Sequence, residues 1–133
     1  MKNIAFFLTP KNEVAFLYDD FTLEESLKKM KNYGYTSIPV ITRKCQYVGT
    51  ISEGDFLWYI TEKNIEKNDF GKVTVKDIEN KEKNPPVKIT VDIDEIIEKS
   101  MNQNFIPVID DTGTFIGIVT RKEIIGYLQN RKD

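Results

Sequence analysis

The sequence predicts a mixed α/β (α+β) fold made of two tandem copies of one unit, each a small β-sheet with two helices, packed as a pseudo-twofold pair. Three observations predict this: an internal repeat, the same order of helix and strand signals in both copies, and an apolar content of 40% in 133 residues, which suffices for a core. A single hairpin with two helices cannot bury both faces of its sheet, which explains why the unit is doubled.

The repeat is visible when the chain is compared with itself at an offset of 68 positions. Residues 38–41, Ile-Pro-Val-Ile, recur as residues 106–109, and six of the 23 positions from Ile38 to Ile60 are identical in the second copy. We therefore expect one module over residues 1–133. Its predicted parts are repeat one at about 1–62, a charged connector at about 63–84 and repeat two at about 85–133.

The first copy combines helix and hairpin signals. Thr22 precedes apolar residues of helical period and has Glu25 at the capping-box spacing, so it starts a helix. Gly34 ends that helix, and a stretch rich in β-formers follows. The predicted elements are a helix at 23–33, strands at 35–41 and 47–51, and a second helix that Ser52 opens.

The second copy repeats this order after a solvated connector. Residues 61–84 hold twelve charged side chains, and the one apolar patch among them could dock as a strand or short helix. Residues 84–86, Asn-Pro-Pro, block helix and mark the boundary of the second copy. The predicted elements are a helix that starts at Thr90 and includes Met101, strands at 104–109 and 114–119, and a helix capped by Thr120.

Composition excludes several classes of function. The chain has no histidine and one cysteine, Cys45, which excludes histidine bases, cysteine metal clusters and an intrachain disulfide. With no activated nucleophile pair either, we expect no enzyme, no metal and no required cofactor. The 19 basic and 21 acidic residues nearly balance, so neither nucleic acid nor a membrane is an expected partner. A reducing, cytoplasmic location fits, because the apolar run at residues 4–8 is too short for a signal peptide.

Two segments carry the candidate chemistry, and in each a hydroxyl is followed three residues later by a carboxylate. They are Ser52 with Asp55 and Thr120 with Glu123. Each pair lies where a strand runs into a helix N-terminus, and free N–H groups and the helix dipole favour phosphate there. The carboxylate, one turn later, can accept hydrogen bonds from ribose hydroxyls. The alternative is a plain capping box that only satisfies the helix, but its occurrence in both copies favours a ligand.

Both copies resemble cystathionine-β-synthase (CBS) domains, and the whole chain resembles a stand-alone CBS pair, or Bateman module. The resemblance rests on residues 34–40 followed by Gly-x-x-Ser-x-x-Asp at 49–55, and on residues 105–108 followed by Gly-x-x-Thr-x-x-Glu at 117–123. It implies two clefts between the repeats that bind adenosine compounds. Cleft A would use Val14, Ala15, Thr36, Ser37, Ile38 and Pro39 with Thr120, Arg121, Lys122 and Glu123. Cleft B would use Ser52, Asp55, Lys88, Ile89, Phe105 and Ile106.

The two implied clefts differ in charge. Cleft A carries Arg121 and Lys122, which suit several phosphate oxygens. Cleft B has Glu53 at the matching place, where a negative charge opposes a polyphosphate but tolerates adenosine or AMP. We therefore expect the phosphate-rich ligand in cleft A.

The chain is also similar to small single-module CBS proteins of Gram-positive bacteria, some of which are cyclic di-AMP receptors. The shared segments are Val14-Ala15, residues 35–39 and residues 120–122, whereas Glu13 stands where those proteins carry a basic residue. The resemblance implies a regulatory sensor for AMP, ADP, ATP or cyclic di-AMP that signals through an effector protein. The alternative is a protein-interaction adaptor with vestigial clefts.

A homodimer is expected as well. The two helices that follow the hairpins carry more apolar surface than one small core needs, and symmetric pairs are the commonest way to cover such surface. The residues concerned are Phe56, Trp58, Tyr59, Ile124 and Tyr127.

Overall fold

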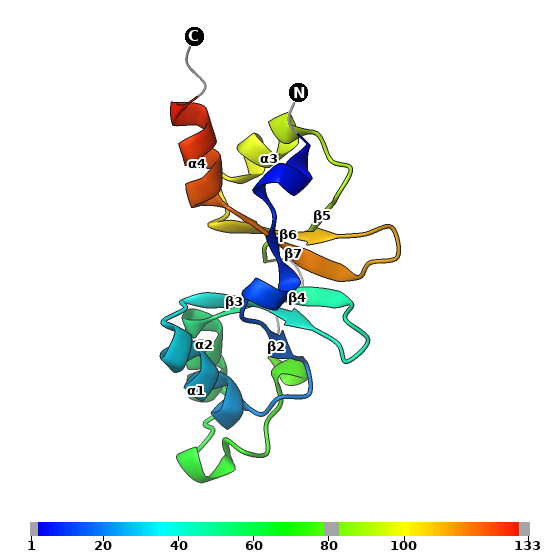
Figure 1. Ribbon diagram of the computed structural model, residues 1–133. Coiled ribbons are helices and arrows are strands. Elements are labelled where there is room, and N and C mark those ends of the chain that lie inside the picture. Colours follow the sequence, from blue (N-terminus) through cyan, green and yellow to red (C-terminus); the bar gives the residue numbers. More distant parts are fainter. Residues whose placement is uncertain (1–2, 79–82, 131–133) are drawn as a thin grey trace. The chain divides into compact units, whose positions relative to one another are not determined.

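The computed structural model describes residues 3–78 and 83–130, which form two compact units. The repeat-one unit is Ala15–Lys83, and the repeat-two unit combines Met1–Val14 with Asn84–Asp133. Each unit has its own sheet, its own helices and its own core (Figure 1). The mixed α/β fold expected from the repeat is confirmed.

The repeat-one unit contains a three-stranded sheet in the order β2-β3-β4. Its elements are β2 (Leu17–Tyr18), α1 (Leu23–Tyr33), β3 (Ser37–Ile41), β4 (Tyr47–Ser52) and α2 (Glu53–Glu62). Strands β3 and β4 form the predicted antiparallel hairpin, in which Ser37 pairs with Ser52. Helices α1 and α2 cover the same face of this sheet (Figure 1). Ile38, Ile51 and Phe56 are buried between the sheet and the helices.

Helix α1 begins and ends where the sequence predicts. The Thr22 Oγ1 atom accepts from the Glu25 N–H at 3.1 Å, and the Glu25 carboxylate accepts from the Thr22 N–H at 2.9 Å, so the capping box is complete. Gly34 ends the helix in the left-handed region, with φ +69°. Strand β3 begins at Ser37 rather than at the predicted Tyr35, because the Tyr35 N–H still bonds to the Met30 carbonyl of the helix at 3.1 Å.

The connector is less solvated than its charge suggests, because its apolar patch docks on the repeat-one unit. Val75 is fully buried in that core and lies in a short 3₁₀ segment, Val75–Asp77. The Leu23 N–H donates to the Val73 carbonyl at 2.8 Å, and the Val75 N–H donates to the Phe21 carbonyl at 2.9 Å. The division of the chain into copies at 1–62, 63–84 and 85–133 stays a prediction, and residues 79–82 lie outside the described residues.

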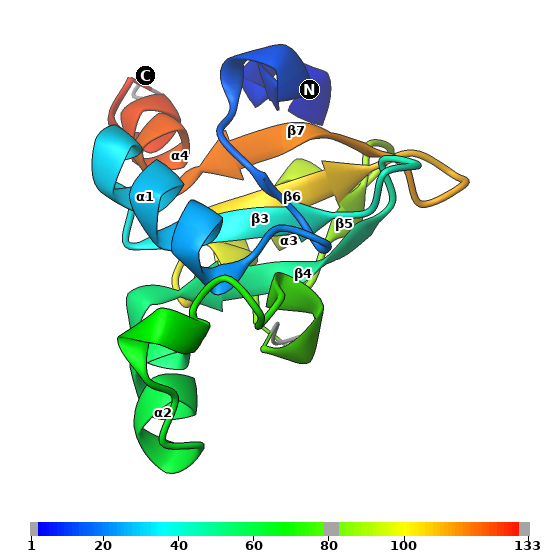
Figure 2. The same cartoon turned by 90° about the horizontal axis from the view of Figure 1, so that it is seen from below.

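The repeat-two unit contains a four-stranded sheet in the order β1-β7-β6-β5. Its elements are β1 (Thr9–Pro10), β5 (Val87–Lys88), α3 (Ile93–Lys99), β6 (Phe105–Ile109), β7 (Phe115–Thr120) and α4 (Arg121–Gln129). The N-terminal segment belongs to this unit: β1 pairs antiparallel with β7, and Ile4 and Phe7 are buried in the same core as Ile106 and Ile124. Figure 2 shows the N-terminal segment beside β7.

The predicted first helix of the second copy is wrong at both ends. Its N-cap is Asp92 rather than Thr90, because a turn closed by the Val91 N–H on the Lys88 carbonyl, at 2.9 Å, follows β5. The helix ends at Lys99, so Met101 lies beyond it and is 78% exposed. Across residues 3–78 and 83–130, no helix is long and apolar enough to span a membrane.

Candidate functional site

The two hydroxyl–carboxylate pairs occupy the same place in their units. Ser52 ends β4 and caps α2, whereas Thr120 ends β7 and caps α4. The first N–H of α2, from Glu53, donates to the Thr36 carbonyl, and the first N–H of α4, from Arg121, donates to the Asn104 carbonyl, both at 2.9 Å. The sequence analysis expected free N–H donors at these helix starts. That expectation is wrong for the first N–H of each helix, because it already donates to the backbone carbonyl of the residue just before the neighbouring strand.

In the repeat-one unit the pair forms a complete capping box. The Asp55 N–H donates to Ser52 Oγ at 3.2 Å, and the Ser52 N–H donates to Asp55 Oδ2 at 2.8 Å. This is the geometry of the plain capping alternative. Asp55 Oδ1 nevertheless remains available as an acceptor for a ligand, because no donor among the described residues contacts it.

A residue that the sequence analysis missed lies on this pair. Lys83 Nζ donates to Ser52 Oγ at 2.9 Å and lies 3.1 Å from Asp55 Oδ2. The Tyr47 hydroxyl donates to the Lys83 carbonyl at 3.4 Å, and burial raises the pKa of Tyr47, which keeps this hydroxyl protonated. Nothing in the sequence marks Lys83, because it is one lysine in a connector rich in charge.

In the repeat-two unit the pair is more open. The Glu123 N–H donates to Thr120 Oγ1 at 3.2 Å, but the reciprocal bond of a capping box is not formed. Glu123 is exposed, and in the described part of the chain its carboxylate has no side-chain partner. A ligand hydroxyl can therefore reach this carboxylate without displacing an existing contact.

Arg121 is held by its own unit. Its Nε donates to the Ser100 carbonyl at 2.7 Å, at the C-terminal end of α3, where a cation is favoured. In the described part of the chain nothing accepts from the two terminal nitrogens of the guanidinium, which are therefore donors for a phosphate. Glu53 occupies the matching position in the repeat-one unit and lines a pocket of about 190 Å³ with Met30 and Lys31, near the end of α1. Glu53, which follows Ser52, thus lies near the end of α1, and Arg121, which follows Thr120, lies near the end of α3.

The remaining predicted residues divide between the two units. Both predicted clefts combine residues of the two units, so their assembly stays a prediction. In the repeat-one unit, Ala15, Ile38 and Pro39 are buried, Ser37 is half-buried and Thr36 is exposed. In the repeat-two unit, Val14, Phe105 and Ile106 are buried, Ile89 is half-buried, and Lys88 and Lys122 are exposed.

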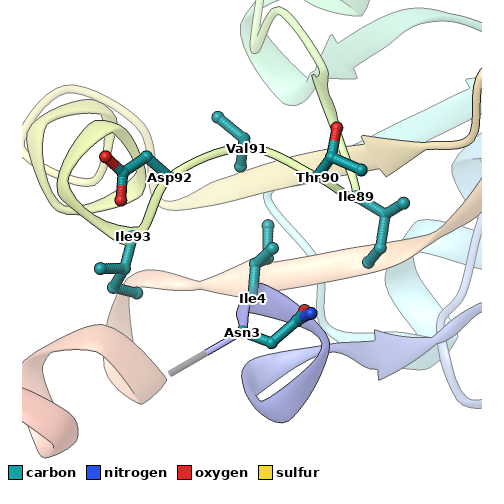
Figure 3. Close-up of a pocket in the computed structure, with 7 residues that line it drawn as sticks. All are labelled: Asn3, Ile4, Ile89, Thr90, Val91, Asp92 and Ile93. Atoms are coloured by element: carbon teal, nitrogen blue, oxygen red, sulfur yellow. The ribbon is translucent and has the colours of Figure 1, made fainter. Parts of the chain in front are cut away.

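The repeat-two unit also holds a pocket of about 380 Å³ that the sequence analysis did not predict (Figure 3). Its walls come from residues 89–93 and from Asn3 and Ile4 of the N-terminal segment. Asn3 Oδ1 is already used, since it accepts from the Ala5 N–H at 2.8 Å. No sequence signal reveals this pocket, because it exists only once the N-terminal segment returns to the second copy.

The family model for the CBS domain matches this chain twice, at residues 6–62 and 75–130. The chain belongs to the CBS-domain family. The two matched segments correspond to the two repeats, each with one hydroxyl–carboxylate pair. No curated protein sequence matches this CBS pair.

Solved structures confirm the resemblance to small CBS proteins of Gram-positive bacteria. The CBS pair is similar to CbpB in complex with c-di-AMP, with 26% identity, 96% of this chain and 85% of that chain covered, and a TM-score of 0.91. A CBS-domain protein from Streptococcus pneumoniae TIGR4 is 29% identical, with 94% and 85% covered and a TM-score of 0.87. CbpB from Streptococcus agalactiae is 26% identical, with 96% and 80% covered and a TM-score of 0.87.

Proposed function

We propose that this CBS pair is a regulatory sensor that binds an adenosine-containing ligand between its repeats and signals through an effector protein. The observation that carries the proposal is the hydroxyl–carboxylate pair at the start of α2 and again at the start of α4. Such a sensor performs no catalytic step and requires no cofactor. The cytoplasmic location expected from the sequence stays a prediction.

Cyclic di-AMP is the specific ligand that we propose, within the general class of AMP, ADP and ATP. It is supported by the similarity to CbpB, whose structure contains c-di-AMP. We assign this phosphate-rich ligand to cleft A, where the terminal nitrogens of Arg121 and the exposed Lys122 supply positive charge. Glu13 opposes the assignment, so Glu13→Lys is expected to raise the affinity if cyclic di-AMP is bound there.

Arg121→Ala is expected to weaken cyclic di-AMP binding by about tenfold or more, because a charge-assisted hydrogen bond contributes roughly 1.5–3 kcal/mol. Asp55→Ala should leave this affinity nearly unchanged, because we assign Asp55 to the other cleft. Titration calorimetry on the two variants measures both effects, with thermal unfolding of the ligand-free variants as the control for the lost Arg121–Ser100 contact. Loss of binding in Asp55→Ala but not in Arg121→Ala would reverse the assignment of the clefts. Failure of the wild type to bind any adenine nucleotide would favour an adaptor with vestigial clefts.

We also propose a homodimer, formed through α2 and α4. The set of dimer-contact residues predicted from the sequence needs correction. Phe56 and Ile124 are buried in the cores of their units and are not exposed to a second copy. The exposed apolar side chains of these helices are Leu57 at 55%, Trp58 at 63%, Ile125 at 47% and Leu128 at 40%. The described residues leave these side chains exposed to this extent, and a second copy of the chain would cover them.

Trp58→Glu is expected to raise the dimer dissociation constant by at least about tenfold, since buried tryptophans at interfaces commonly contribute 2 kcal/mol or more. Sedimentation at micromolar concentration, with and without cyclic di-AMP, measures the change. Glu62→Ala on the same helix serves as the matched control, because Glu62 is exposed and charged. A wild-type protein that sediments only as a monomer under both conditions would rule out the dimer.

A further inference from the structure

The ammonium group of Lys83 contacts the hydroxyl–carboxylate pair of the repeat-one unit. It contacts Ser52 Oγ at 2.9 Å and Asp55 Oδ2 at 3.1 Å. The Lys83 and Asp55 side chains are 31% and 20% exposed, so the pair is ordered by its contacts and still open to solvent. Lys83 lies 31 positions after Ser52, and only the folded unit brings them together.

The contacts leave one donor and one acceptor side by side. An ammonium group has three N–H donors; that of Lys83 donates to Ser52 Oγ and forms an ion pair with Asp55 Oδ2. The Asp55 carboxylate uses Oδ2 for the Ser52 N–H and for Lys83, while Oδ1 has no partner among residues 3–78 and 83–130. A ligand with a hydroxyl beside an oxyanion matches both groups, because Asp55 accepts from the hydroxyl and Lys83 donates to the oxyanion.

The charge at this pair differs from the charge that the sequence suggests. The sequence places Glu53 in cleft B, where its negative charge is expected to oppose a polyphosphate but to tolerate adenosine or AMP. In the structure Glu53 lines the pocket near the end of α1, together with Lys31. Among residues 3–78 and 83–130, the charged side chain in contact with Ser52 and Asp55 is that of Lys83, whose positive charge offsets the carboxylate of Asp55.

We propose that Lys83 is a ligand-contacting residue of the Ser52–Asp55 site and selects an adenosine ligand that carries a phosphate, such as AMP, over adenosine itself. This inference rests on the proposed sensor function. Asp55 accepts from the ribose, Ser52 keeps the ammonium in place, and the third N–H of Lys83 binds a phosphate oxygen. The ammonium already contacts Ser52 Oγ and Asp55 Oδ2, so it is positioned before the ligand arrives.

Lys83→Gln is expected to lower the affinity for AMP by about tenfold or more and to leave the affinity for adenosine unchanged. Titration calorimetry with AMP and with adenosine measures the ratio of the two affinities. Lys83→Arg should retain most of the preference for AMP, since it keeps the charge. Lys72→Gln is the matched control: Lys72 is 78% exposed, pairs with Asp69 in the same unit and should leave both affinities unchanged.

The outcomes separate this inference from the proposed function. A wild-type protein that binds no adenine nucleotide, cyclic di-AMP included, refutes both. A wild-type protein that binds one of them, but whose preference for AMP over adenosine is absent or survives in Lys83→Gln, overturns the role of Lys83 alone. A rise of both affinities in Lys83→Gln also overturns it, because Lys83 would then only block Asp55. If the role of Lys83 is purely structural, Lys83→Gln should lose affinity for AMP and for adenosine by the same factor, and this result also overturns the inference.

Discussion

Gly117→Ala is expected to destabilise the protein by about 3 kcal/mol or more, because two separate costs add at this position. A Cβ atom on Gly117 would lie 2.2 Å from the Thr9 carbonyl oxygen and 2.9 Å from Leu8 Cδ1. The backbone φ of +154° is also one that side-chain-bearing residues rarely adopt. Strand β1 pairs directly with this glycine through Pro10, so the substitution should also displace the N-terminal segment from β7.

Chemical denaturation measures the loss in free energy of unfolding, and limited proteolysis measures release of the N-terminal segment. Gly126→Ala is the matched control in the same unit. Gly126 lies inside α4, and a Cβ atom there would meet no atom within 4 Å. Alanine in a helix interior is favoured over glycine by roughly 0.5–1 kcal/mol, so this control should be slightly more stable than the wild type. Equal stability of the two variants would contradict the close approach of β1 to β7.

Phe56→Ala is expected to lower the free energy of unfolding by about 3–5 kcal/mol, as is usual for a large aromatic side chain removed from a core. Phe56 is 1% exposed and packs in the repeat-one core with Ile38, Ile51 and Val75. The cavity would lie under α2, whose first turn carries Asp55 and the contact with Lys83. We therefore expect the variant to lose ligand affinity as well as stability.

Denaturant unfolding followed by circular dichroism tests the stability change, and the m-value shows whether unfolding stays cooperative. Leu57→Ala is the matched control, because Leu57 is the next residue of α2 and is 55% exposed in the single chain. Both variants are measured at a concentration too low for the proposed dimer to form, since Leu57 belongs to its interface. Removal of the Leu57 side chain should change the free energy of unfolding of the monomer by less than about 1 kcal/mol. A similar loss in the free energy of unfolding for Phe56→Ala and Leu57→Ala would mean that α2 does not bury Phe56 and expose Leu57 as described.

Much of the fold follows from local signals in the sequence. The capping residues Thr22, Ser52 and Thr120 are identified correctly, because an N-cap depends on a hydroxyl and on the few residues after it. The start of α3 is the exception. Thr90 and Asp92 are both suitable caps, and the choice of Asp92 depends on the turn that follows β5.

By itself the sequence determined the doubled unit, the order of the main helices and hairpins and the place of both hydroxyl–carboxylate pairs, because each of these can be recognised from the order of residues along the chain. The tertiary structure alone decided which distant segments meet. It brings Thr9 to the second copy beside Ile118, Lys83 onto Ser52 and Asp55, and Arg121 onto the Ser100 carbonyl. Such contacts leave no local pattern, since they form only when burial of the two cores fixes the chain around them.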